Sequence, residues 1–328
     1  DFDLNLMKPN QNLYNLTADI LTNMKSVLED FQPEYVFVHG DTTTTMAASI
    51  ASFYNGSKVC HVEAGLRTND KYSPFPEEIN RQIAGRVCDF HFAPTITSKN
   101  NLLTENIKEE NILVTGNTVI DALLESVDKV NKKPSKLILS LSEKLGESDL
   151  ILVTGHRREN HGDGFIRICE ALKEIARLNE DKIIIYPVHL NPKVKEPVNR
   201  ILSNIPNIIL IDPLAYEDFI WMMNRSKLII TDSGGVQEEA PSLGKPVLVM
   251  RDTTERPEAV DAGTVILVGT NKELIVKETL GLLNNSDRFD EMSRLHNPYG
   301  DGQASHRIVN FIAKLESIAM GSNIVETK

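Results

Sequence analysis

The stretch Thr231-Asp232-Ser233-Gly234-Gly235-Val236-Gln237-Glu238-Glu239 closes a short apolar run, Leu228–Thr231, that is typical of a buried strand. Its glycines let the backbone approach a ligand closely, and a helix is expected to begin at them. The free N–H groups and the dipole of a helix N-terminus favour a bound diphosphate. Glu239, on the second turn, is placed to accept hydrogen bonds from ribose hydroxyls. The same pattern also fits an ordinary strand-to-helix turn that binds nothing.

Two other polar signatures follow apolar runs in the first half of the chain: His39-Gly40-Asp41-Thr42-Thr43-Thr44-Thr45 and His61-Val62-Glu63-Ala64-Gly65-Leu66-Arg67-Thr68. In an open α/β sheet, ligands bind beyond the carboxyl ends of the strands. We therefore expect Asp41 and Glu63 to lie near each other, with Glu77 aimed at the same place by the stiff segment before it. Carboxylates that share a pocket acquire different pKa values, so one can serve as an acid and another as a base.

These carboxylates also have plain structural interpretations. Asp41 is placed to cap the helix that follows it. Glu63 and Glu77 are placed to form salt bridges with Arg67 or Arg81. The sequence leaves both interpretations open.

A charged cluster, Thr154-Gly155-His156-Arg157-Arg158-Glu159-Asn160, closes another apolar run, Leu150–Val153. His156 is suited to acid/base chemistry or to donating a hydrogen bond to phosphate. Arg157 or Arg158 can pair with a phosphate through two parallel hydrogen bonds. The alternative is a solvated surface loop.

Three further residues are candidates of lower specificity. Phe219 can stack on a base or fill the core, and the core is the commoner role. His189 ends a strand and either lines the ligand site or caps the turn. Arg256 belongs to a charged segment, residues 251–258, that either faces a ligand or is a solvated loop. Two other histidines are interpreted as structural: His39 and His61.

Strand and helix signals alternate along the chain, which predicts an α/β fold with parallel sheets. The polar segment Asn131-Lys132-Lys133-Pro134-Ser135 is the best linker candidate. We expect two doubly wound, Rossmann-like domains facing each other across a cleft: residues 1–130, completed by a C-terminal helix at 303–320, and a nucleotide-binding domain at 136–302. The predicted strands are Tyr35–Val38, Val59–Val62, Phe90–Ala93, Ile112–Val114, Leu150–Val153, Ile183–Val188, Ile208–Ile211, Leu228–Thr231, Val247–Met250 and Thr264–Val268.

Composition narrows the classes of function. The 328 residues favour two domains, and a net charge of −11 argues against broad nucleic-acid binding. No apolar run approaches the ~20 residues of a membrane span. The three cysteines have no metal-like spacing, and we expect buried thiols in a reducing cytoplasm. Neither a G-x-G-x-x-G nor a P-loop pattern is present, and no cluster of cysteines and histidines has the spacing of a metal site.

The start of the chain, Asp1-Phe2-Asp3-Leu4, has no initiator Met and no opening strand. We expect that the first strand of the first domain is missing. On this interpretation the 328-residue chain alone is poorly stable and nearly inactive.

Six signatures, in order and with compatible spacing, make the chain resemble one enzyme family, the non-hydrolysing UDP-N-acetylglucosamine 2-epimerases of bacteria and archaea, here N-terminally truncated. They are His39-Gly40-Asp41-Thr42, His61-Val62-Glu63-Ala64-Gly65-Leu66-Arg67, Pro76-Glu77-Glu78-Ile79-Asn80-Arg81, Thr154-Gly155-His156-Arg157-Arg158-Glu159, Thr231-Asp232-Ser233-Gly234-Gly235 and Thr254-Glu255-Arg256-Pro257-Glu258.

The resemblance implies a fold like the GT-B glycosyltransferases, a homodimer in the cytoplasm, and no cofactor. It implies a catalytic set of Asp41, Glu63, Glu77 and His156. It also implies a substrate and UDP site of Arg157, Phe219, Ser233, Gly234, Gly235, Glu239 and Arg256. UDP-N-acetylglucosamine is then both substrate and allosteric activator, with His189 and Glu77 near the second pocket.

The implied reaction is reversible epimerisation at C2, giving UDP-N-acetylmannosamine. It proceeds by anti elimination of UDP and syn re-addition through 2-acetamidoglucal. The alternatives are a hydrolysing 2-epimerase that releases N-acetylmannosamine and UDP, a GT-B glycosyltransferase, and a non-catalytic UDP-sugar sensor.

Overall fold

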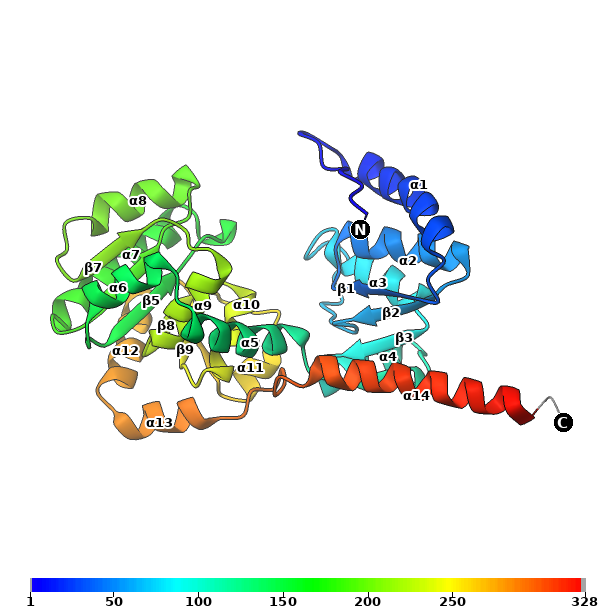
Figure 1. Cartoon of the computed structure of the whole chain (residues 1–328). Helices are drawn as coiled ribbons and strands as arrows, with labels where there is room; N and C mark the ends of the chain where they lie inside the picture. The colour runs from blue at the N-terminus through cyan, green and yellow to red at the C-terminus, as the bar shows by residue number, and fades with distance from the viewer. Residues whose placement is uncertain (1, 326–328) are drawn as a thin grey trace. The chain divides into compact units, whose positions relative to one another are not determined.

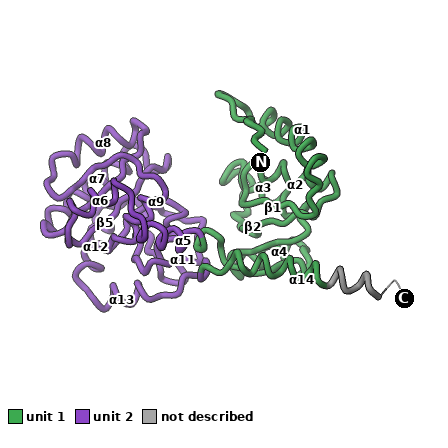
Figure 2. The backbone as a smooth tube through the Cα atoms, in the orientation of Figure 1, with its two compact units in different colours: residues 1–121, 302–328 green, residues 122–301 purple. Residues whose placement is uncertain are grey.

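The computed structural model describes residues 2–325, with side chains up to residue 317, so Asp1 lies outside the described residues. The chain divides into two compact units (Figure 2). Unit 1 is Asp1–Asp121 with Gly302–Lys328, and unit 2 is Ala122–Asp301. All ten predicted strands are present, each with ends within one residue of the prediction. The α/β class with two parallel-sheet, Rossmann-like units is therefore confirmed.

Unit 1 is built on a parallel sheet of order β1-β2-β3-β4 (Figure 1). One face packs an apolar cluster that includes Val38, Ala48 and Ala84, from β1, α2 and α3. The other packs Phe92 of β3 against Ile308 of α14. The elements are α1 (Leu13–Phe31), β1 (Tyr35–His39), α2 (Thr43–Asn55), β2 (Lys58–Val62), α3 (Glu77–Val87), β3 (Phe90–Ala93), α4 (Ile96–Thr104), η1 (Glu109–Asn111), β4 (Ile112–Val114) and α14 (Ala304–Val325).

Unit 2 is built on a six-stranded parallel sheet of order β10-β9-β8-β5-β6-β7. The chain runs outward from β5 to β7, then returns to pair β8 with β5 and continues to β10. The carboxyl ends of β5 and β8 therefore flank the point where strand order reverses, which is where such sheets bind ligands. The strands are β5 (Leu150–Thr154), β6 (Ile183–Pro187), β7 (Ile208–Ile211), β8 (Leu228–Thr231), β9 (Val247–Val249) and β10 (Val265–Leu267).

Helices cover both faces of this second sheet. The core joins buried side chains of α7 and α12, such as Phe165, Ile168 and Ile275, to strand residues such as Ile151 and Ile230. The helices are α6 (Lys136–Leu145), η2 (Arg158–Asn160), α7 (Asp163–Leu178), α8 (Pro192–Leu202), α9 (Tyr216–Arg225), α10 (Gly234–Ser242), α11 (Pro257–Asp261), α12 (Lys272–Leu283) and α13 (Ser286–Arg294).

The division between the units falls inside a helix, α5 (Thr118–Lys132), after Asp121. The segment 131–135, expected as the linker, instead joins α5 to α6 within unit 2. Ser135 caps α6 by accepting a hydrogen bond from the N–H of Ile138. Helix α5 runs through the boundary with buried side chains on either side of Asp121, such as Ile120 and Leu123. A polar, Pro-containing segment does not by itself mark a domain boundary.

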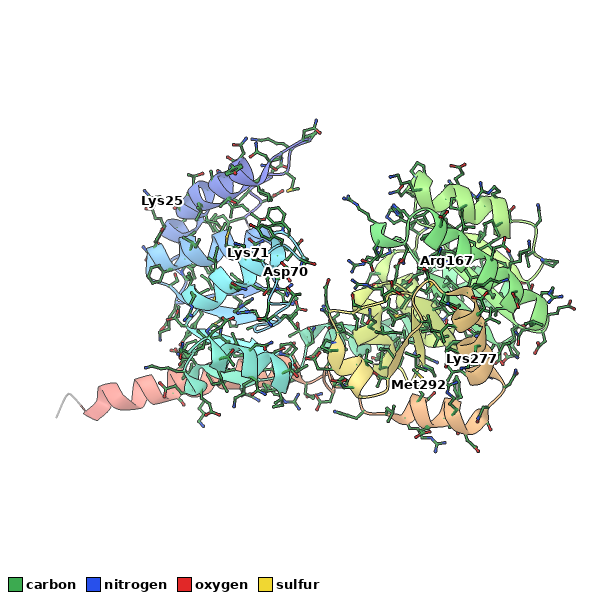
Figure 3. All side chains as sticks on the ribbon, turned by 180° about the vertical axis from the view of Figure 1, so that it is seen from behind. Lys25, Asp70, Lys71, Arg167, Lys277 and Met292 are labelled. Atoms are coloured by element: carbon green, nitrogen blue, oxygen red, sulfur yellow. The ribbon has the colours of Figure 1, made fainter. Side chains whose placement is uncertain are left out.

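Polar side chains lie mainly on the outside of both units, as Lys25 of α1 and Arg167 of α7 do (Figure 3). Cys60, Cys88 and Cys169 are buried and free. Within the described part of the chain, no helix is long and apolar enough to cross a membrane. In the same part, no group of three or more His, Cys, Asp or Glu side chains is arranged to hold a metal ion.

The side chain of Asp121 ties together the two places where the chain passes between units. Its carboxylate accepts hydrogen bonds from the N–H groups of Ala304 (3.1 Å) and Ser305 (2.8 Å), at the start of α14. A nearby bond runs from Arg307 to the carbonyl of Thr115 (2.9 Å). Asp121 therefore satisfies N–H groups that the helix itself cannot.

Replacing Asp121 by Ala should destabilise α14 by about 1–2 kcal/mol, because its first turn loses both acceptor contacts. This loss of stability should make the amide hydrogens of α14 exchange roughly 5- to 30-fold faster, which hydrogen exchange of peptides from α14 measures. Asp121→Asn should fall between, since it keeps an acceptor without the charge. Asp128→Ala is the control: its exposed pair with Lys132 contributes little. Wild-type exchange in Asp121→Ala would contradict the assignment.

Candidate active site

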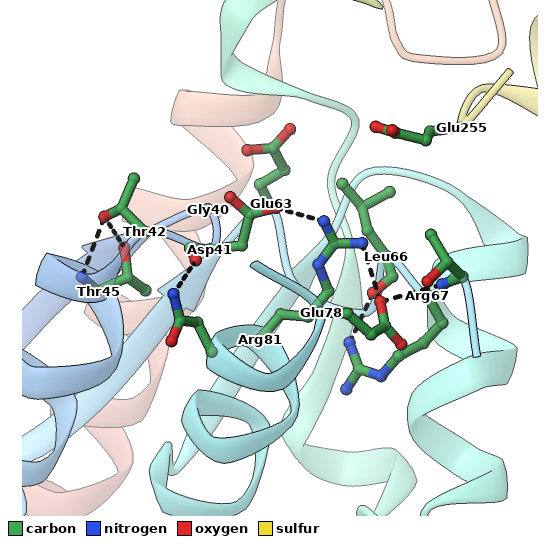
Figure 4. Close-up of polar contacts among 12 residues, drawn as sticks. Gly40, Asp41, Thr42, Thr45, Glu63, Leu66, Arg67, Glu78, Arg81 and Glu255 are labelled. Carbon is green, nitrogen blue, oxygen red and sulfur yellow. Dashed lines mark hydrogen bonds and ion pairs between the residues drawn. The ribbon is translucent and has the colours of Figure 1, made fainter. Parts of the chain in front are cut away.

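The carboxyl ends of β1 and β2 lie side by side in unit 1, with His39 opposite Val62. Asp41 follows β1 directly. The cap of α2 is Thr42, whose hydroxyl accepts the N–H of Thr45 (3.2 Å), so the expected capping role does not belong to Asp41. Asp41 instead accepts a hydrogen bond from Arg81 of α3, with Oδ2 2.5 Å from Nη2 (Figure 4).

Arg81 connects two carboxylates. Its side chain is 7% exposed, and Nη1 lies 3.3 Å from Oε2 of the fully buried Glu78. Glu78 in turn accepts the backbone N–H groups of Thr68 (3.0 Å) and Asn69 (3.2 Å). The chain Asp41–Arg81–Glu78 thus fastens the end of β1, helix α3 and the loop after β2 to one another.

The salt-bridge partners expected for Glu63 and Glu77 are taken by other residues. Arg81 pairs with Asp41 and Glu78, and Arg67 forms a bidentate pair with Glu105 (2.6 and 2.9 Å). Arg67 is almost completely buried, so this pair is part of the structure of unit 1. The salt bridges expected between Glu63 or Glu77 and Arg67 or Arg81 are therefore not formed.

Glu63 adopts left-handed backbone angles, with φ +63°. This conformation is uncommon outside glycine, and it is found often at functional sites. It turns the carboxylate back across Gly40, where a Cβ atom would lie 3.2 Å from Oε2. Asn117 donates to Oε1 (3.4 Å), and His39 Nε2 is 3.5 Å from Oε2. Glu63 therefore lies beside the residue that precedes Asp41.

Glu77 is the first residue of α3 and is half-buried. Within the described part of the chain, its side chain makes no hydrogen bond or ion pair. The three carboxylates thus have different surroundings. Asp41 lies beside a buried cation, Glu63 lies beside a neutral amide and a histidine, and Glu77 lies at the partly solvated start of a helix.

The two histidines of this region differ from each other. His61 is buried with Nε2 2.7 Å from the carbonyl of Gly40, and burial lowers its pKa to about 4, so it is structural as expected. His39 is not structural in that sense: its side chain is 59% exposed and faces Glu63. The sequence alone did not predict this exposed position of His39. The signal that could have indicated it is its place as the last residue of a strand, because ligands bind beyond the carboxyl ends of strands.

In unit 2, the loops after β5 and β8 meet at the point where strand order reverses. The last residues of these strands, Thr154 and Thr231, are paired, with their hydroxyl oxygens 2.6 Å apart. Asp232 follows β8 and is fully buried. Its Oδ2 accepts the backbone N–H groups of His156 and Arg157, both at 2.9 Å. The sequence cluster 154–160 is therefore anchored to the signature 231–239.

Helix α10 begins at Gly234 with an open N-terminus. Ser233 is the cap residue, but its side chain makes no capping hydrogen bond. A Cβ atom on Gly234 would lie 3.8 Å from Nη2 of Arg157, so the guanidinium group stands beside the start of the helix. Among the described residues no carboxylate lies within ion-pair distance of Arg157, and its buried Nε has no hydrogen-bond partner. Free N–H groups and an unpaired guanidinium together make an anion site.

Glu239, on the same helix, is 6% exposed. Burial raises its pKa to about 7, and the negative charge of Glu238 adds to this, while a hydrogen bond from the hydroxyl of Tyr216 (3.1 Å) opposes it. Phe219 lies one turn after Tyr216 on α9 and is half-buried, whereas Ile220 fills the core. Phe219 and Tyr216, three residues apart, therefore share one face of α9.

Arg256 and His189 flank this region. Arg256 donates from Nε to Glu238 of α10, which makes it a neighbour of the glycine turn rather than part of a solvated loop. His189 stacks on His156 with ring centroids 5.6 Å apart, and its Nδ1 accepts the N–H of Asn191 (3.1 Å). The turn-capping role that the sequence left open for His189 is therefore present, and its place beside a ligand stays a prediction. The two histidines, Arg157 and Asn191 contribute to the lining of a pocket of about 430 Å³.

Comparison with known proteins finds relatives along nearly the whole chain. A sequence model described as UDP-N-acetylglucosamine 2-epimerase matches residues 1–313. The UDP-N-acetylglucosamine 2-epimerase of Escherichia coli strain K12 is 58% identical over 312 residues, which cover 94% of this chain and 83% of that protein.

Solved structures agree with the sequence relatives. The crystal structure of a UDP-GlcNAc 2-epimerase from Neisseria meningitidis bound to UDP-GlcNAc is 49% identical, with a TM-score of 0.86, over 96% of this chain and 85% of that one. The Methanocaldococcus jannaschii UDP-GlcNAc 2-epimerase, in complex with UDP-GlcNAc and UDP, is 35% identical with a TM-score of 0.74, over 94% and 86% of the two chains.

Replacing Arg81 by Met should destabilise the protein by about 3 kcal/mol, because Asp41 and Glu78 lose a shared, buried cation. The change in the free energy of unfolding is measured by urea titration, with hydrogen exchange of peptides from unit 1 as the signal. Arg81→Lys should recover part of the loss. The matched control is Lys99→Met, whose partner Glu109 is 73% exposed, and which should change stability by less than about 1 kcal/mol. Equal stabilities of the two Met variants would refute the role of Arg81.

Proposed function

The chain belongs to the UDP-N-acetylglucosamine 2-epimerase family, and on that premise we propose that it interconverts UDP-N-acetylglucosamine and UDP-N-acetylmannosamine without hydrolysis. One observation carries the proposal beyond the family name. The same chain holds an open helix N-terminus beside an unpaired guanidinium, suited to a diphosphate, and three carboxylates at strand and helix ends, suited to moving a proton.

Unit 2 is proposed to bind the nucleotide. The diphosphate would take the N–H groups of Gly234 and Gly235 and the side-chain hydroxyl of Ser233, together with Arg157. The backbone N–H of Ser233 already donates to the hydroxyl of Thr231 (3.0 Å). The ribose hydroxyls would donate to Glu239. These assignments account for a guanidinium without a carboxylate partner and for a buried glutamate whose pKa is raised in the unliganded chain.

Phe219 and Arg256 complete the proposed UDP site. Phe219 is half-buried on α9 and can contact the base. Arg256 supports α10 through Glu238 and adds positive charge near the phosphates.

The reaction must remove a hydrogen from C2 of the sugar that no neighbouring carbonyl acidifies. Breaking the bond between C1 and the UDP oxygen gives C1 oxocarbenium character, which makes the C2 hydrogen acidic enough for a carboxylate base. The electrons of the C2–H bond form the C1–C2 double bond, and UDP leaves with the electrons of the C1–O bond. The products of this anti elimination are UDP and 2-acetamidoglucal.

The return step protonates C2 from the opposite face, and UDP adds again to C1 on the same side. A base on one face and an acid on the other require more than one carboxyl group. Asp41, Glu63 and Glu77 supply three in different settings, and the division of the two roles among them is left to experiment. His156 and the start of α10 are proposed to hold the charge of the departed UDP.

Three alternatives make different products. A hydrolysing 2-epimerase releases N-acetylmannosamine and UDP. A GT-B glycosyltransferase needs an acceptor and has no evident use for the three carboxylates. A UDP-sugar sensor makes no product, and its function survives the loss of Asp41 and Glu63. No contact of the described residues favours any of the three.

Assembly, location and regulation are proposed on the family resemblance. They comprise a homodimer, a cytoplasmic location, and activation by a second UDP-N-acetylglucosamine near His189 and Glu77. The stacked pair of His189 and His156 supports a link between that second ligand and the reaction.

Incubation of the protein with UDP-N-acetylglucosamine in heavy water should place deuterium at C2 of both UDP-sugars, because the proton that returns comes from solvent. Proton NMR detects the loss of the C2 signal and the appearance of the manno isomer. The mechanism is excluded if an epimer forms with no deuterium at C2, and the epimerase assignment is excluded if free N-acetylmannosamine is the main product. Asp41→Asn and Glu63→Gln should slow exchange at least about 100-fold. Glu109→Gln, at an exposed site, is the control.

Binding of UDP should release a proton near neutral pH. The pKa of Glu239 is about 7 in the unliganded chain, and ribose hydroxyls that donate to the carboxylate favour its ionised form and lower this pKa. About half a proton per UDP is then released at pH 7, and the affinity for UDP rises as pH increases through 7. Calorimetry in buffers of different ionisation enthalpy measures the release.

Two variants test the source of this proton. Glu239→Gln should abolish the release, and Glu217→Gln, at an exposed position on α9, should leave it unchanged. An unchanged proton release in Glu239→Gln would show that another group titrates.

A further inference from the structure

A buried carboxylate outside the proposed catalytic set stands at the centre of the unit 2 site. Asp232 directly follows β8 and is 0% exposed. Its Oδ2 accepts three donors: the N–H groups of His156 and Arg157 (2.9 Å each) and the side-chain amide of Asn160 (3.3 Å). These contacts fully occupy one oxygen and explain the conformation of the loop after β5.

The second oxygen has a different setting. Oδ1 of Asp232 is buried, has no hydrogen-bond partner among the residues that the structure describes, and lies 3.5 Å from Nδ1 of His156. A buried carboxylate oxygen without a donor is unfavourable. A small rotation of the imidazole would bring Nδ1–H into hydrogen-bond distance of Oδ1. The other ring nitrogen, Nε2, then remains available on a side chain that is 43% exposed.

The charged and titratable groups around His156 come from three elements. Arg157 is its neighbour on the same loop, His189 stacks on its ring from the loop after β6, and Asp232 faces it from β8. Arg158 and Glu159 line the same pocket. Burial lowers the pKa of His156, and Arg157 and His189 act in the same direction, whereas Asp232 raises it. Asp232 is thus the neighbour that favours the imidazolium form.

We propose that Asp232 is a positioning residue for His156, holding Nδ1–H with Oδ1 so that Nε2 is directed to the nucleotide's diphosphate. The inference rests on the proposed function only for the identity of that ligand. A carboxylate behind a histidine selects the tautomer and the orientation of the ring and stabilises the imidazolium. Because the same carboxylate holds the backbone of Arg157, it sets both groups against the start of α10.

Asp232→Asn separates this role from simple anchoring of the loop. The carbonyl oxygen of Asn can replace Oδ2 and accept the backbone N–H groups, so the loop is retained. Its NH₂ group then faces Nδ1 of His156, which must become an acceptor, and the ring proton moves to Nε2.

The tautomer is measured by ¹⁵N NMR of the full chain labelled at histidine, with His156→Gln used to assign the signals. In the wild type, neutral His156 should carry its proton on Nδ1. In Asp232→Asn the proton should move to Nε2, the pKa should fall by about one unit or more, and turnover at pH 7 should fall at least about tenfold. Asp181→Asn, an exposed carboxylate remote from the loop, is the control and should change none of these.

The wild-type spectrum alone can overturn the proposal, because a neutral His156 protonated on Nε2 is incompatible with it even when Asp232→Asn does not fold. An unchanged tautomer and pKa in a folded Asp232→Asn variant would also overturn it and leave Asp232 as an anchor. If the tautomer switches as expected but the wild type makes no UDP-N-acetylmannosamine, then the proposed function fails and the pairing of Asp232 with His156 stands.

Discussion

The pairing of β5 with β8 in the middle of the unit 2 sheet is the interaction on which the proposed nucleotide site depends. It brings the ends of two strands that are far apart in sequence to within hydroxyl contact, Thr154 beside Thr231. The contacts of the proposed site in unit 2 follow from it: Asp232 reaches the backbone of His156 and Arg157 because the two strands end side by side. The order of the strands places this edge where parallel sheets leave room for a ligand.

Unit 1 uses the same constraint with different chemistry. The ends of β1 and β2 are adjacent, and the left-handed turn at Glu63 directs its carboxylate over Gly40. Asp41 is fixed from the other side by Arg81, which is itself held by a fully buried glutamate. A surface pair of this kind would contribute little to stability, but burial makes its geometry definite. The carboxylates are therefore held in separate settings rather than gathered into one interchangeable cluster.

The positive charge at the start of α10 contrasts with the negative net charge of the chain. The chain carries a net charge of −11, yet the start of α10 offers open N–H groups beside Arg157, which has no carboxylate partner in the described part of the chain. An anionic ligand is thus favoured at one point of an otherwise acidic protein. Glu239 differs from Arg157 because burial raises its pKa to about 7, so that the carboxyl is partly protonated near neutral pH. Hydroxyl groups that donate to it would favour its ionised form. Together these features suit a ligand with phosphates next to hydroxyl groups.

The sequence by itself determined the α/β class, the ten strands and the family, because apolar periodicity, turn residues and motifs are local properties of the chain. It also identified the strand ends that carry polar residues. Tertiary structure decided what those residues touch: Arg81 binds Asp41 rather than Glu63 or Glu77, His39 faces Glu63 instead of the core, and the units divide inside α5 rather than at residues 131–135. Asp232 and Glu239 make the reason plain, since their settings come from burial and from partners on other strands and helices. Such contacts depend on strand order and packing, which no local pattern records.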